Sequence, residues 1–168
     1  MNTVFLSIGT NLGQREENLT NAIKMIENET GLIQALSSVY ETEPWEMSMC
    51  DLFLNMVLRI ETSLNPHILL ATLLDIEDKM GRRREDLEYS SRIIDIDILF
   101  FNDFIINEKN LNIPHLLIEH RRFVLEPLVE IATWLIHPAV GKSVESLLES
   151  CTDSCVVRKT EIVLRCFL

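Results

Sequence analysis

Two aspartates separated by one residue form the polar pair in this sequence that is best suited to chemistry. They lie in the string Arg92-Ile93-Ile94-Asp95-Ile96-Asp97, whose apolar residues alternate as in a half-buried strand. Because successive side chains of a strand point to opposite faces, Asp95 and Asp97 share one face. Two neighbouring carboxylates stay ionised at low cost only beside cations, and such oxygen ligands suit Mg²⁺ held together with substrate phosphates. A plain polar sheet face is the alternative interpretation.

Arginines cluster close to these carboxylates. Of the ten arginines, six fall in two stretches: Arg82, Arg83, Arg84 and Arg92 in the first, and Arg121 and Arg122 in the second. A guanidinium binds phosphate oxygens through paired hydrogen bonds, so arginines beside an aspartate pair favour phosphoryl transfer over a merely solvated basic face. The sequence has neither the Walker phosphate loop nor the glycine loop of kinases.

The composition is that of an ordinary globular domain. The 168 residues are 47% hydrophobic and 24% charged, and the net charge of -11 disfavours a nucleic-acid partner. No apolar run approaches the ~18 residues of a membrane span, and the N-terminus lacks a secretory signal. We therefore expect a cytoplasmic monomer without a membrane partner, folded as one domain over residues 1–168.

The hydrophobic pattern predicts an α+β sandwich with a mostly antiparallel sheet. In the strand at 93–101, Ile94, Ile96, Ile98 and Phe100 are expected on one face. In the strand at 53–62, Phe53 and Asn55 are expected together on the face opposite the aliphatic residues. Trp134 is expected in the core. Further strands are predicted at 3–9, 32–41 and 156–164, a short pairing segment at 104–106, and helices over 19–26, 66–80, 123–131 and 144–148.

Six motifs in a fixed order resemble the 6-hydroxymethyl-7,8-dihydropterin pyrophosphokinase family of folate biosynthesis. They are Gly9-Thr10-Asn11-Leu12-Gly13, Glu41-Thr42-Glu43-Pro44, Phe53-Leu54-Asn55, Glu77 before Gly81-Arg82, Arg92-x-x-Asp95-x-Asp97, and Pro114-His115-x5-Arg121-x-Phe123. The resemblance covers roughly residues 3–138 and leaves 139–168 as a supporting extension. It implies a ferredoxin-like fold and an enzyme that transfers diphosphate from ATP to the pterin hydroxymethyl group, releasing AMP.

The resemblance also implies roles for individual residues. Asp95 and Asp97 would hold two Mg²⁺ ions, and Asp97 or a water would accept the hydroxyl proton. The triphosphate and the rest of ATP would be bound by Glu77, Arg82, Arg84, Arg92, Ile98, His115 and Arg121. The pterin would lie between Phe53 and Phe123, with Thr42, Pro44, Asn55 and Trp45 around it.

Three positions depart from the family's usual pattern. Glu88-Tyr89-Ser90-Ser91 precede Arg92 where a basic residue and a glycine-proline pair are common, which predicts a more mobile loop and weaker ATP binding. Leu116 follows His115 in place of a tyrosine or proline, and Phe53 replaces a tyrosine. Two other functions stay open from the sequence: a two-metal phosphohydrolase or nuclease, and a ligand-binding regulatory module.

Overall fold

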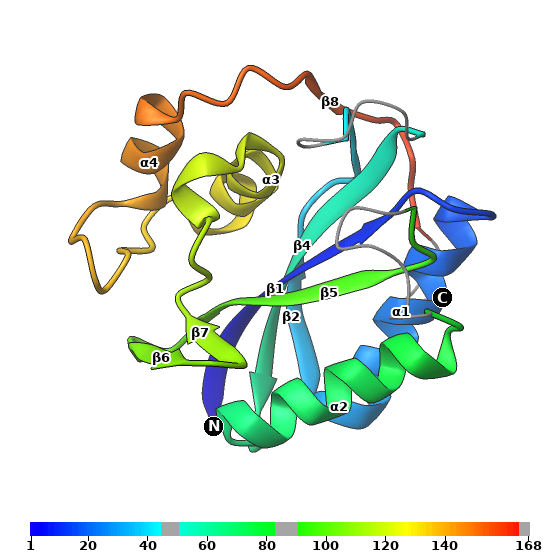
Figure 1. The fold of residues 1–168 in the computed structure, drawn as a ribbon, viewed down its shortest axis with the longest axis horizontal. Helices are drawn as coiled ribbons and strands as arrows, with labels where there is room; N and C mark the ends of the chain where they lie inside the picture. Colours follow the sequence, from blue (N-terminus) through cyan, green and yellow to red (C-terminus); the bar gives the residue numbers. More distant parts are fainter. Residues whose placement is uncertain (45–50, 83–90, 165–168) are drawn as a thin grey trace.

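The computed structural model describes residues 1–44, 51–82 and 91–164, and it is built around one antiparallel sheet (Figure 1). The strands follow the order β5-β1-β4-β3-β8, and β2 also pairs with β4. All of these neighbours are antiparallel. The strand bounds are β1 Asn2–Thr10, β2 Leu32–Leu36, β3 Tyr40–Thr42, β4 Phe53–Thr62, β5 Asp95–Phe101 and β8 Val157–Lys159.

Two helices connect strands that are not neighbours in the sheet. Helix α1, Arg15–Thr30, leads from β1 to β2, and helix α2, Pro66–Lys79, leads from β4 to β5. Since β1 and β2 are both antiparallel to β4, they run parallel to each other with β4 between them. In the same way, β4 and β5 run parallel on either side of β1. This pair of split β-α-β units is the ferredoxin-like arrangement, so the predicted fold class is confirmed.

Local signals explain where these helices begin and end. The Asn65 side chain accepts the N–H of Ile68 at 3.0 Å, and Pro66 opens α2, as expected from the sequence. Gly31 follows α1 with a φ of 145°, and a Cβ there would lie 2.2 Å from the carbonyl oxygen of Glu61. Only glycine fits this close approach of the helix end to β4.

The two faces of the sheet are covered differently. Helices α1 and α2 cover one face of the sheet. The aliphatic side chains buried between the helices and this face include Leu6, Leu19, Leu58 and Ile96. On the other face, helices α3, Arg122–Ala132, and α4, Val144–Ser150, pack over Phe5, Val57 and Leu99. Figure 1 shows α3 and α4 together at one end of the sheet, away from α1 and α2.

Along this second face the side chains change from apolar to polar. On β1, Phe5 is followed by Ser7 and Gly9; on β4, Val57 is preceded by Asn55 and Phe53; on β5, Leu99 is preceded by Asp97 and Asp95. The register places Ser7 opposite Asp97, and Gly9 opposite both Asn55 and Asp95. The three central strands therefore present their polar residues at one common corner of the sheet.

Some predicted elements differ in detail. The single strand expected at 32–41 is two strands, β2 and β3, and the final strand is only Val157–Lys159. Phe100 lies in the cluster with α3 rather than with Ile96 and Ile98, because the pairing of β1 with β5 shifts register between Phe5 and Leu6. The extra residue reverses the alternation at that point.

The pairing segment expected at 104–106 is a hairpin of β6, Ile106–Glu108, and β7, Leu111–Ile113, followed by a short 3-10 turn, Ile118–His120. Trp134 was expected in the core but is 61% exposed, and its ring lies edge-to-face with that of Phe5, 6.4 Å between the ring centres. No helix within the described ranges is both long and apolar enough to span a bilayer.

Candidate active site

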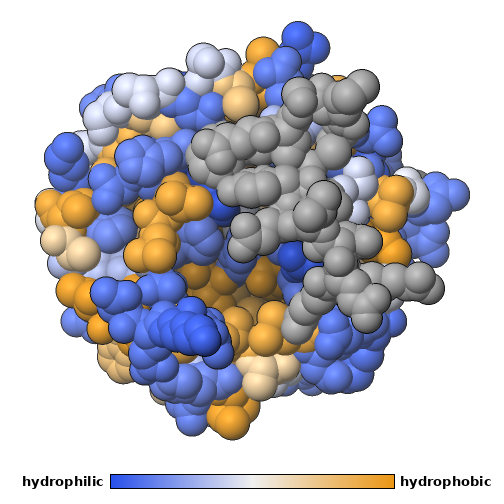
Figure 2. Space-filling view, in the orientation of Figure 1, coloured by the Kyte–Doolittle hydropathy of each residue, from blue (hydrophilic) through white to orange (hydrophobic). Residues whose placement is uncertain are grey.

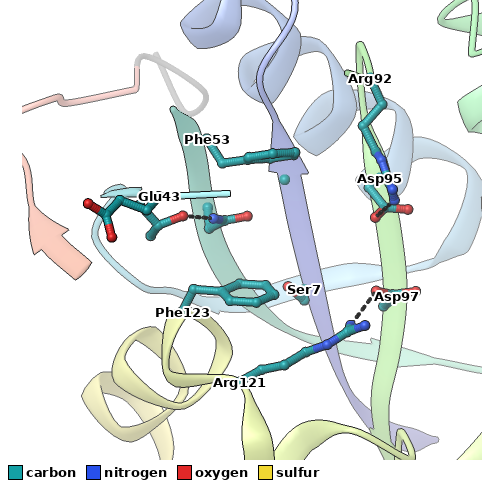
Figure 3. A pocket seen from close by; sticks show the side chains of 11 residues that line it. Ser7, Glu43, Phe53, Arg92, Asp95, Asp97, Arg121 and Phe123 are labelled. Atoms are coloured by element: carbon teal, nitrogen blue, oxygen red, sulfur yellow. Dashed lines mark hydrogen bonds and ion pairs between the residues drawn. The ribbon is translucent and has the colours of Figure 1, made fainter. Parts of the chain in front are cut away.

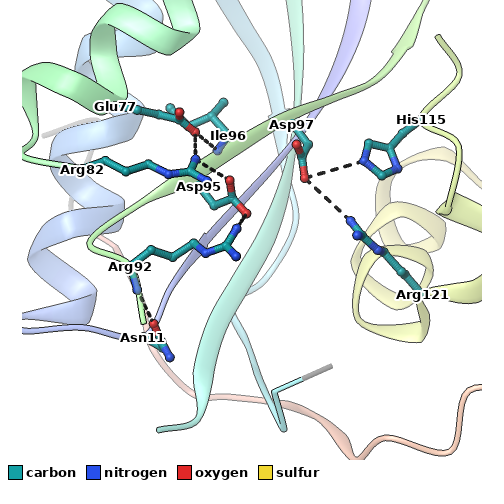
Figure 4. Close-up of polar contacts among 9 residues, drawn as sticks. All are labelled: Asn11, Glu77, Arg82, Arg92, Asp95, Ile96, Asp97, His115 and Arg121. Carbon is teal, nitrogen blue, oxygen red and sulfur yellow. Dashed lines mark hydrogen bonds and ion pairs between the residues drawn. The ribbon is translucent and has the colours of Figure 1, made fainter. Parts of the chain in front are cut away.

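Asp95, at the start of β5, lies between two arginines (Figure 4). Arg82 donates to its Oδ1 and Arg92 donates to its Oδ2. Arg82 also donates to Glu77, whose Oε1 accepts the backbone N–H of Ile96 at 2.7 Å. Glu77 is only 1% exposed, and the guanidinium of Arg82 compensates the charge of its buried carboxylate. The end of α2 is thus joined to β5 by a carboxylate and arginine cluster.

The turn after β1 fixes the position of Arg92. The backbone N–H of Arg92 donates to Asn11 Oδ1 at 2.7 Å, and the backbone N–H of Asn11 donates to the carbonyl of Arg92 at 3.2 Å. Asn11 is 2% exposed and follows β1 directly. The glycine-rich turn singled out in the sequence therefore serves to hold an arginine beside Asp95.

Asp97 faces a second pair of basic residues. Its Oδ2 lies 3.8 Å from Arg121 Nη1 and 4.0 Å from His115 Nε2. Burial and the neighbouring Asp95 raise the pKa of Asp97 to about 7, although Arg121 acts in the opposite direction. The site therefore contains one carboxyl group that can gain or lose a proton near neutral pH.

His115 is neutral at physiological pH. Burial and the charge of Arg121 lower the pKa of His115 to about 4. Its Nδ1 accepts the backbone N–H of Leu117 at 3.2 Å, so the ring proton resides on Nε2, the atom that faces Asp97. His115 therefore offers one hydrogen-bond donor to the site and no charge.

An aromatic-walled pocket adjoins the aspartate pair (Figure 3). Phe53 extends from β4 and Phe123 from the start of α3, and the space between their rings opens toward Asp95 and Asp97. Asn55 lies in the same pocket, is 4% exposed, and donates from Nδ2 to Thr42 Oγ1 at 2.7 Å. The pocket thus combines two flat apolar walls with an amide that can still form hydrogen bonds through its oxygen.

Gly9 makes room for this amide. A Cβ at position 9 would lie 2.4 Å from Asn55 Oδ1 and 3.9 Å from the Phe53 ring. Glycine therefore leaves space here for the Asn55 amide, which a larger residue would displace. Ser7 lines the same pocket two residues earlier on the strand.

A second cavity lies on the other side of the aspartate pair. It is lined by residues of α2, β5 and the hairpin segment, among them Glu77, Arg82, Ile98, Asn112, His115 and Arg121. Figure 2 shows this face of the molecule hollowed near its middle, with hydrophobic side chains at the bottom of the hollow. Asp95, Asp97 and Arg121 line both this cavity and the aromatic pocket. The aspartate pair is therefore the point at which the two cavities meet.

Most residues selected from the sequence lie in these two cavities. The aromatic pocket contains Thr42, Phe53, Asn55, Arg92, Asp95, Asp97, Arg121 and Phe123, and the second cavity contains Glu77, Arg82, Ile98 and His115. Pro44 is half-buried and does not line either cavity. Trp45, Arg84 and the Glu88-Tyr89-Ser90 string lie outside the described residues.

Among the lining residues that received no individual role from the sequence are Ser7, Gly9 and Asn112. Ser7 and Gly9 were identifiable in principle, because they are the small residues that alternate with Leu6 and Ile8 on the first strand. Nothing in the sequence distinguished Asn112 as a functional residue, because it lies among the other polar residues of the hairpin. Its Oδ1 is buried and has no hydrogen-bond partner among the residues that the structure describes.

A ferredoxin-like sheet that brings two aspartates, several arginines and an aromatic pocket together defines a phosphoryl-transfer type of enzyme. The model of the family 7,8-dihydro-6-hydroxymethylpterin-pyrophosphokinase (HPPK) matches residues 5–133. The chain belongs to this family, so the family and enzyme class expected from the sequence are confirmed.

Curated relatives agree with this assignment. The chain is 40% identical to the 2-amino-4-hydroxy-6-hydroxymethyldihydropteridine pyrophosphokinase of Aquifex aeolicus, over 84% of this chain and 88% of that protein. It is 39% identical to the Bacillus subtilis protein of the same name, over 77% of this chain and 78% of that protein. It is 41% identical to the folic acid synthesis protein FOL1 of Dictyostelium discoideum over 83% of this chain, but spans only 21% of that protein.

A solved structure supports the fold. Plasmodium falciparum HPPK-DHPS matches 89% of this chain with a TM-score of 0.73 at 22% sequence identity. The match spans 43% of the Plasmodium chain, so it supports the fold of one part of that larger protein.

Proposed function

We propose that this chain transfers the diphosphate group of ATP to the hydroxymethyl group of 6-hydroxymethyl-7,8-dihydropterin and releases AMP. The observation that carries the proposal is the meeting of two cavities at Asp95 and Asp97. One cavity has the flat walls and the amide that a bicyclic ring needs, and the other has the arginines that a triphosphate needs. The reacting hydroxyl and phosphorus would meet between them.

The pterin would be held in the aromatic pocket. Phe53 and Phe123 would stack on its two faces, and stacking alone does not distinguish one flat ring from another. Discrimination would come from Asn55, whose Oδ1 can accept from the ring edge while Nδ2 is held by Thr42. Because Asn55 is buried, a ring that left its oxygen without a donor would bind more weakly.

ATP would occupy the second cavity. Arg82 and Arg121 of this cavity, with Arg92 from the adjoining aromatic pocket, would bind the phosphate oxygens, and the neutral His115 would donate one further hydrogen bond. The buried Oδ1 of Asn112 lacks a partner among the described residues, and it could accept from the amino group of the nucleobase. Arg84 and Trp45 keep the nucleotide and pterin roles predicted from the sequence.

Two Mg²⁺ ions would be held by Asp95 and Asp97 together with phosphate oxygens. No group of three His, Cys, Asp or Glu side chains suitable for a metal occurs within the described residues. A carboxylate pair fits Mg²⁺, which proteins typically hold by one or two carboxylates plus substrate phosphates. When bound, Mg²⁺ neutralises phosphate charge and lowers the pKa of a coordinated hydroxyl.

The protein's own contribution is orientation, charge and a proton acceptor. Arg82 and Arg121 would compensate the charge that develops on the leaving AMP and on the transferred group. Asp97 or a water would accept the proton from the pterin hydroxyl as the hydroxyl oxygen attacks the β-phosphorus and AMP leaves. The closed packing of Phe53 and Phe123 on the ring would fix the hydroxyl in line with that phosphorus.

The direct test is to mix the protein with ATP, Mg²⁺ and 6-hydroxymethyl-7,8-dihydropterin and to separate the nucleotide products. We expect AMP, formed only when the pterin is present and lost when a chelator is added. AMP or ADP formed without the pterin would instead support a phosphohydrolase, and nucleotide binding without turnover would support a binding module.

We also propose that the enzyme works as a monomer on small molecules and binds no nucleic acid. The net charge of -11 supports the second point, because a phosphate backbone would be repelled. Sedimentation equilibrium would test the first, and a gel-shift assay with single- and double-stranded DNA and RNA would test the second.

A further inference from the structure

The first turn of helix α3 is capped by a residue far away in the sequence. Arg121 occupies the N-cap position but forms no side-chain cap. Instead, the backbone N–H of Arg122 donates to Asp153 Oδ2 at 3.0 Å, and Arg122 Nε donates to the backbone carbonyl of Asp153 at 3.1 Å. A carboxylate at this position satisfies a free N–H group and interacts favourably with the positive end of the helix.

Two active-site residues flank this capped position. Arg121, before Arg122, lies 3.8 Å from Asp97, and Phe123, after it, forms one wall of the aromatic pocket. The guanidinium carbon of Arg121 also lies 5.7 Å from the centre of the Phe123 ring. A shift of the first turn of α3 would therefore move one wall of the pocket and one cation of the site together.

The segment that carries Asp153 also holds the opposite side of the pocket. Strand β8 pairs with β3, with Val157 opposite Thr42. The backbone N–H of Val156 donates to Glu43 Oε2 at 3.2 Å, and the backbone N–H of Glu43 donates to the carbonyl of Val156 at 3.3 Å. Thr42 in turn receives the hydrogen bond from Asn55. Both sides of the pocket are thus attached to residues 153–160.

A second attachment joins the same segment to α3. Lys159 Nζ donates to Glu130 Oε1 at 2.8 Å, and Glu130 also accepts from the N–H and hydroxyl of Ser38 and from the Tyr40 hydroxyl. Lys159 stands opposite Tyr40 in the pairing of β8 with β3. The start and the C-terminal part of α3 are therefore both fixed relative to β3 through residues 153–160.

We infer that Asp153 is a positioning residue for the pterin pocket: by capping α3 it sets Phe123 and Arg121 relative to Phe53. The inference rests on the proposed function, because it assigns Asp153 to the same pocket. It goes beyond the family assignment, since the family model ends at residue 133 and the motifs end before residue 139. The extension 139–168, expected only as support, would thereby contribute to substrate binding.

The test compares three variants of the full chain. Asp153→Ala removes the cap, and Asp153→Asn keeps a side-chain oxygen that can accept from Arg122. Ser143→Ala is the matched control, because the Ser143 side chain caps α4 by accepting the N–H of Ser146 at 3.1 Å, and Ser143 lines neither cavity. The dissociation constant of 6-hydroxymethylpterin is measured by its fluorescence well below the melting temperature, with KM and kcat for the dihydropterin.

For Asp153→Ala we expect pterin binding to weaken about tenfold, the fold-change that loss of one helix cap would give if the pocket depends on it. The KM for the pterin should rise more than kcat falls. Asp153→Asn should restore most of the affinity, and Ser143→Ala should bind the pterin as the wild type does. Unchanged binding in Asp153→Ala, an equal defect in Asp153→Asn, or an equal defect in Ser143→Ala would each overturn the inference.

Hydrogen exchange separates this inference from the proposed function. The amide of Arg122 should exchange faster in Asp153→Ala than in the wild type, whatever the substrate. If the wild type shows no pterin-dependent AMP, the proposed function fails. If the wild type is active but the Arg122 amide stays protected in Asp153→Ala, the inference fails instead.

Discussion

The carboxylate of Asp95 is shared by Arg82 and Arg92, with one guanidinium on each oxygen (Figure 4). Both oxygens of this carboxylate are therefore engaged by cations that belong to the protein. A divalent cation and the two arginines would compete for the same negative charge. Phosphate oxygens would relieve that competition, because they give the arginines another partner when a magnesium nucleotide binds.

This competition predicts opposite effects of one substitution on two ligands. Arg92→Met removes a positive charge beside Asp95, so Mg²⁺ alone should bind more tightly, by about threefold to tenfold for one screened charge. The affinity for ATP should fall by about tenfold or more, because a charge-assisted phosphate contact is lost. Titration calorimetry with each ligand separately measures both effects.

Arg158→Met is the control for that experiment. Arg158 lies on β8, at the opposite edge of the sheet from β5, so the variant loses the same charge at a distance. It should leave both affinities unchanged. If Arg92→Met weakened Mg²⁺ and ATP binding alike, the arginines would not compete with the cation for Asp95.

Tight pterin binding is predicted to need the absence of a side chain at Gly9. In Gly9→Ala the new methyl group would meet Asn55 Oδ1, so the amide must move away from the pocket. Pterin binding should weaken about tenfold to a hundredfold, as expected when a buried hydrogen bond is lost. Nucleotide affinity in the absence of pterin should not change.

A double-mutant cycle tests the cause of that effect. If Gly9→Ala acts through Asn55, then adding it to Asn55→Ala should cost little further affinity. Fully additive losses would show that the methyl group disturbs the pocket in another way.

Most residues that the sequence selected line the two cavities, because the selection rested on local patterns. Asp-x-Asp on β5 and Phe-x-Asn on β4 each fix a shared face by alternation alone, and the structure places each pair on one face of the sheet, with β1 between the two strands. Asn65-Pro66 and Gly31 mark helix ends by local backbone preference, and these were also recovered.

What the sequence could not provide depends on contacts between distant residues. The register shift that moves Phe100 to the other face arises from the pairing of β1 with β5, and nothing local to Phe100 signals it. The cap that Asp153 gives to Arg122 joins residues 31 positions apart, and the buried oxygen of Asn112 is exceptional only once its surroundings are known. Trp134 was misplaced because a large apolar residue predicts burial only on average.

His137 is predicted to make the folded protein less stable in mild acid. Burial lowers the pKa of His137 from its usual 6.5, and its Nδ1 accepts the N–H of Ala139 at 3.3 Å. At this residue the unfolded chain therefore binds more protons than the folded one below pH ~6.5, so the contribution of His137 to stability falls as the pH decreases through that value and is constant above it. Urea unfolding between pH 5 and 8 measures this dependence.

His137→Asn isolates the contribution of His137 to that curve. An asparagine oxygen can accept the same N–H without titrating, so the variant should show a flatter dependence of the unfolding midpoint on pH. If the wild type and the variant lose stability in parallel on acidification, other groups are responsible.

Asp97 is predicted to act as the proton acceptor of the reaction. Asp97→Asn should lower kcat by about a hundredfold to ten-thousandfold, the range expected for loss of a general base. Asp103→Asn, at an exposed position beyond the end of β5, should have no effect. A full rate in Asp97→Asn, with magnesium nucleotide still bound, would exclude this role.

Asn112 is predicted to select the nucleobase. Its buried Oδ1 has no hydrogen-bond partner in the described ranges, and it lies in the same cavity as Arg82 and His115. A buried acceptor without a partner is costly, so a ligand that donates to it gains affinity and a ligand that presents another acceptor loses it. Adenine carries an amino group that inosine replaces with a carbonyl oxygen. The wild type should therefore prefer ATP over ITP by about tenfold to a hundredfold in kcat/KM.

Asn112→Leu, in which the new side chain has nearly the same shape, should bring this ratio close to one by weakening ATP use and tolerating ITP. If Asn112→Leu lowered the use of both nucleotides equally and kept the ratio, Asn112 would support the cavity wall without reading the base.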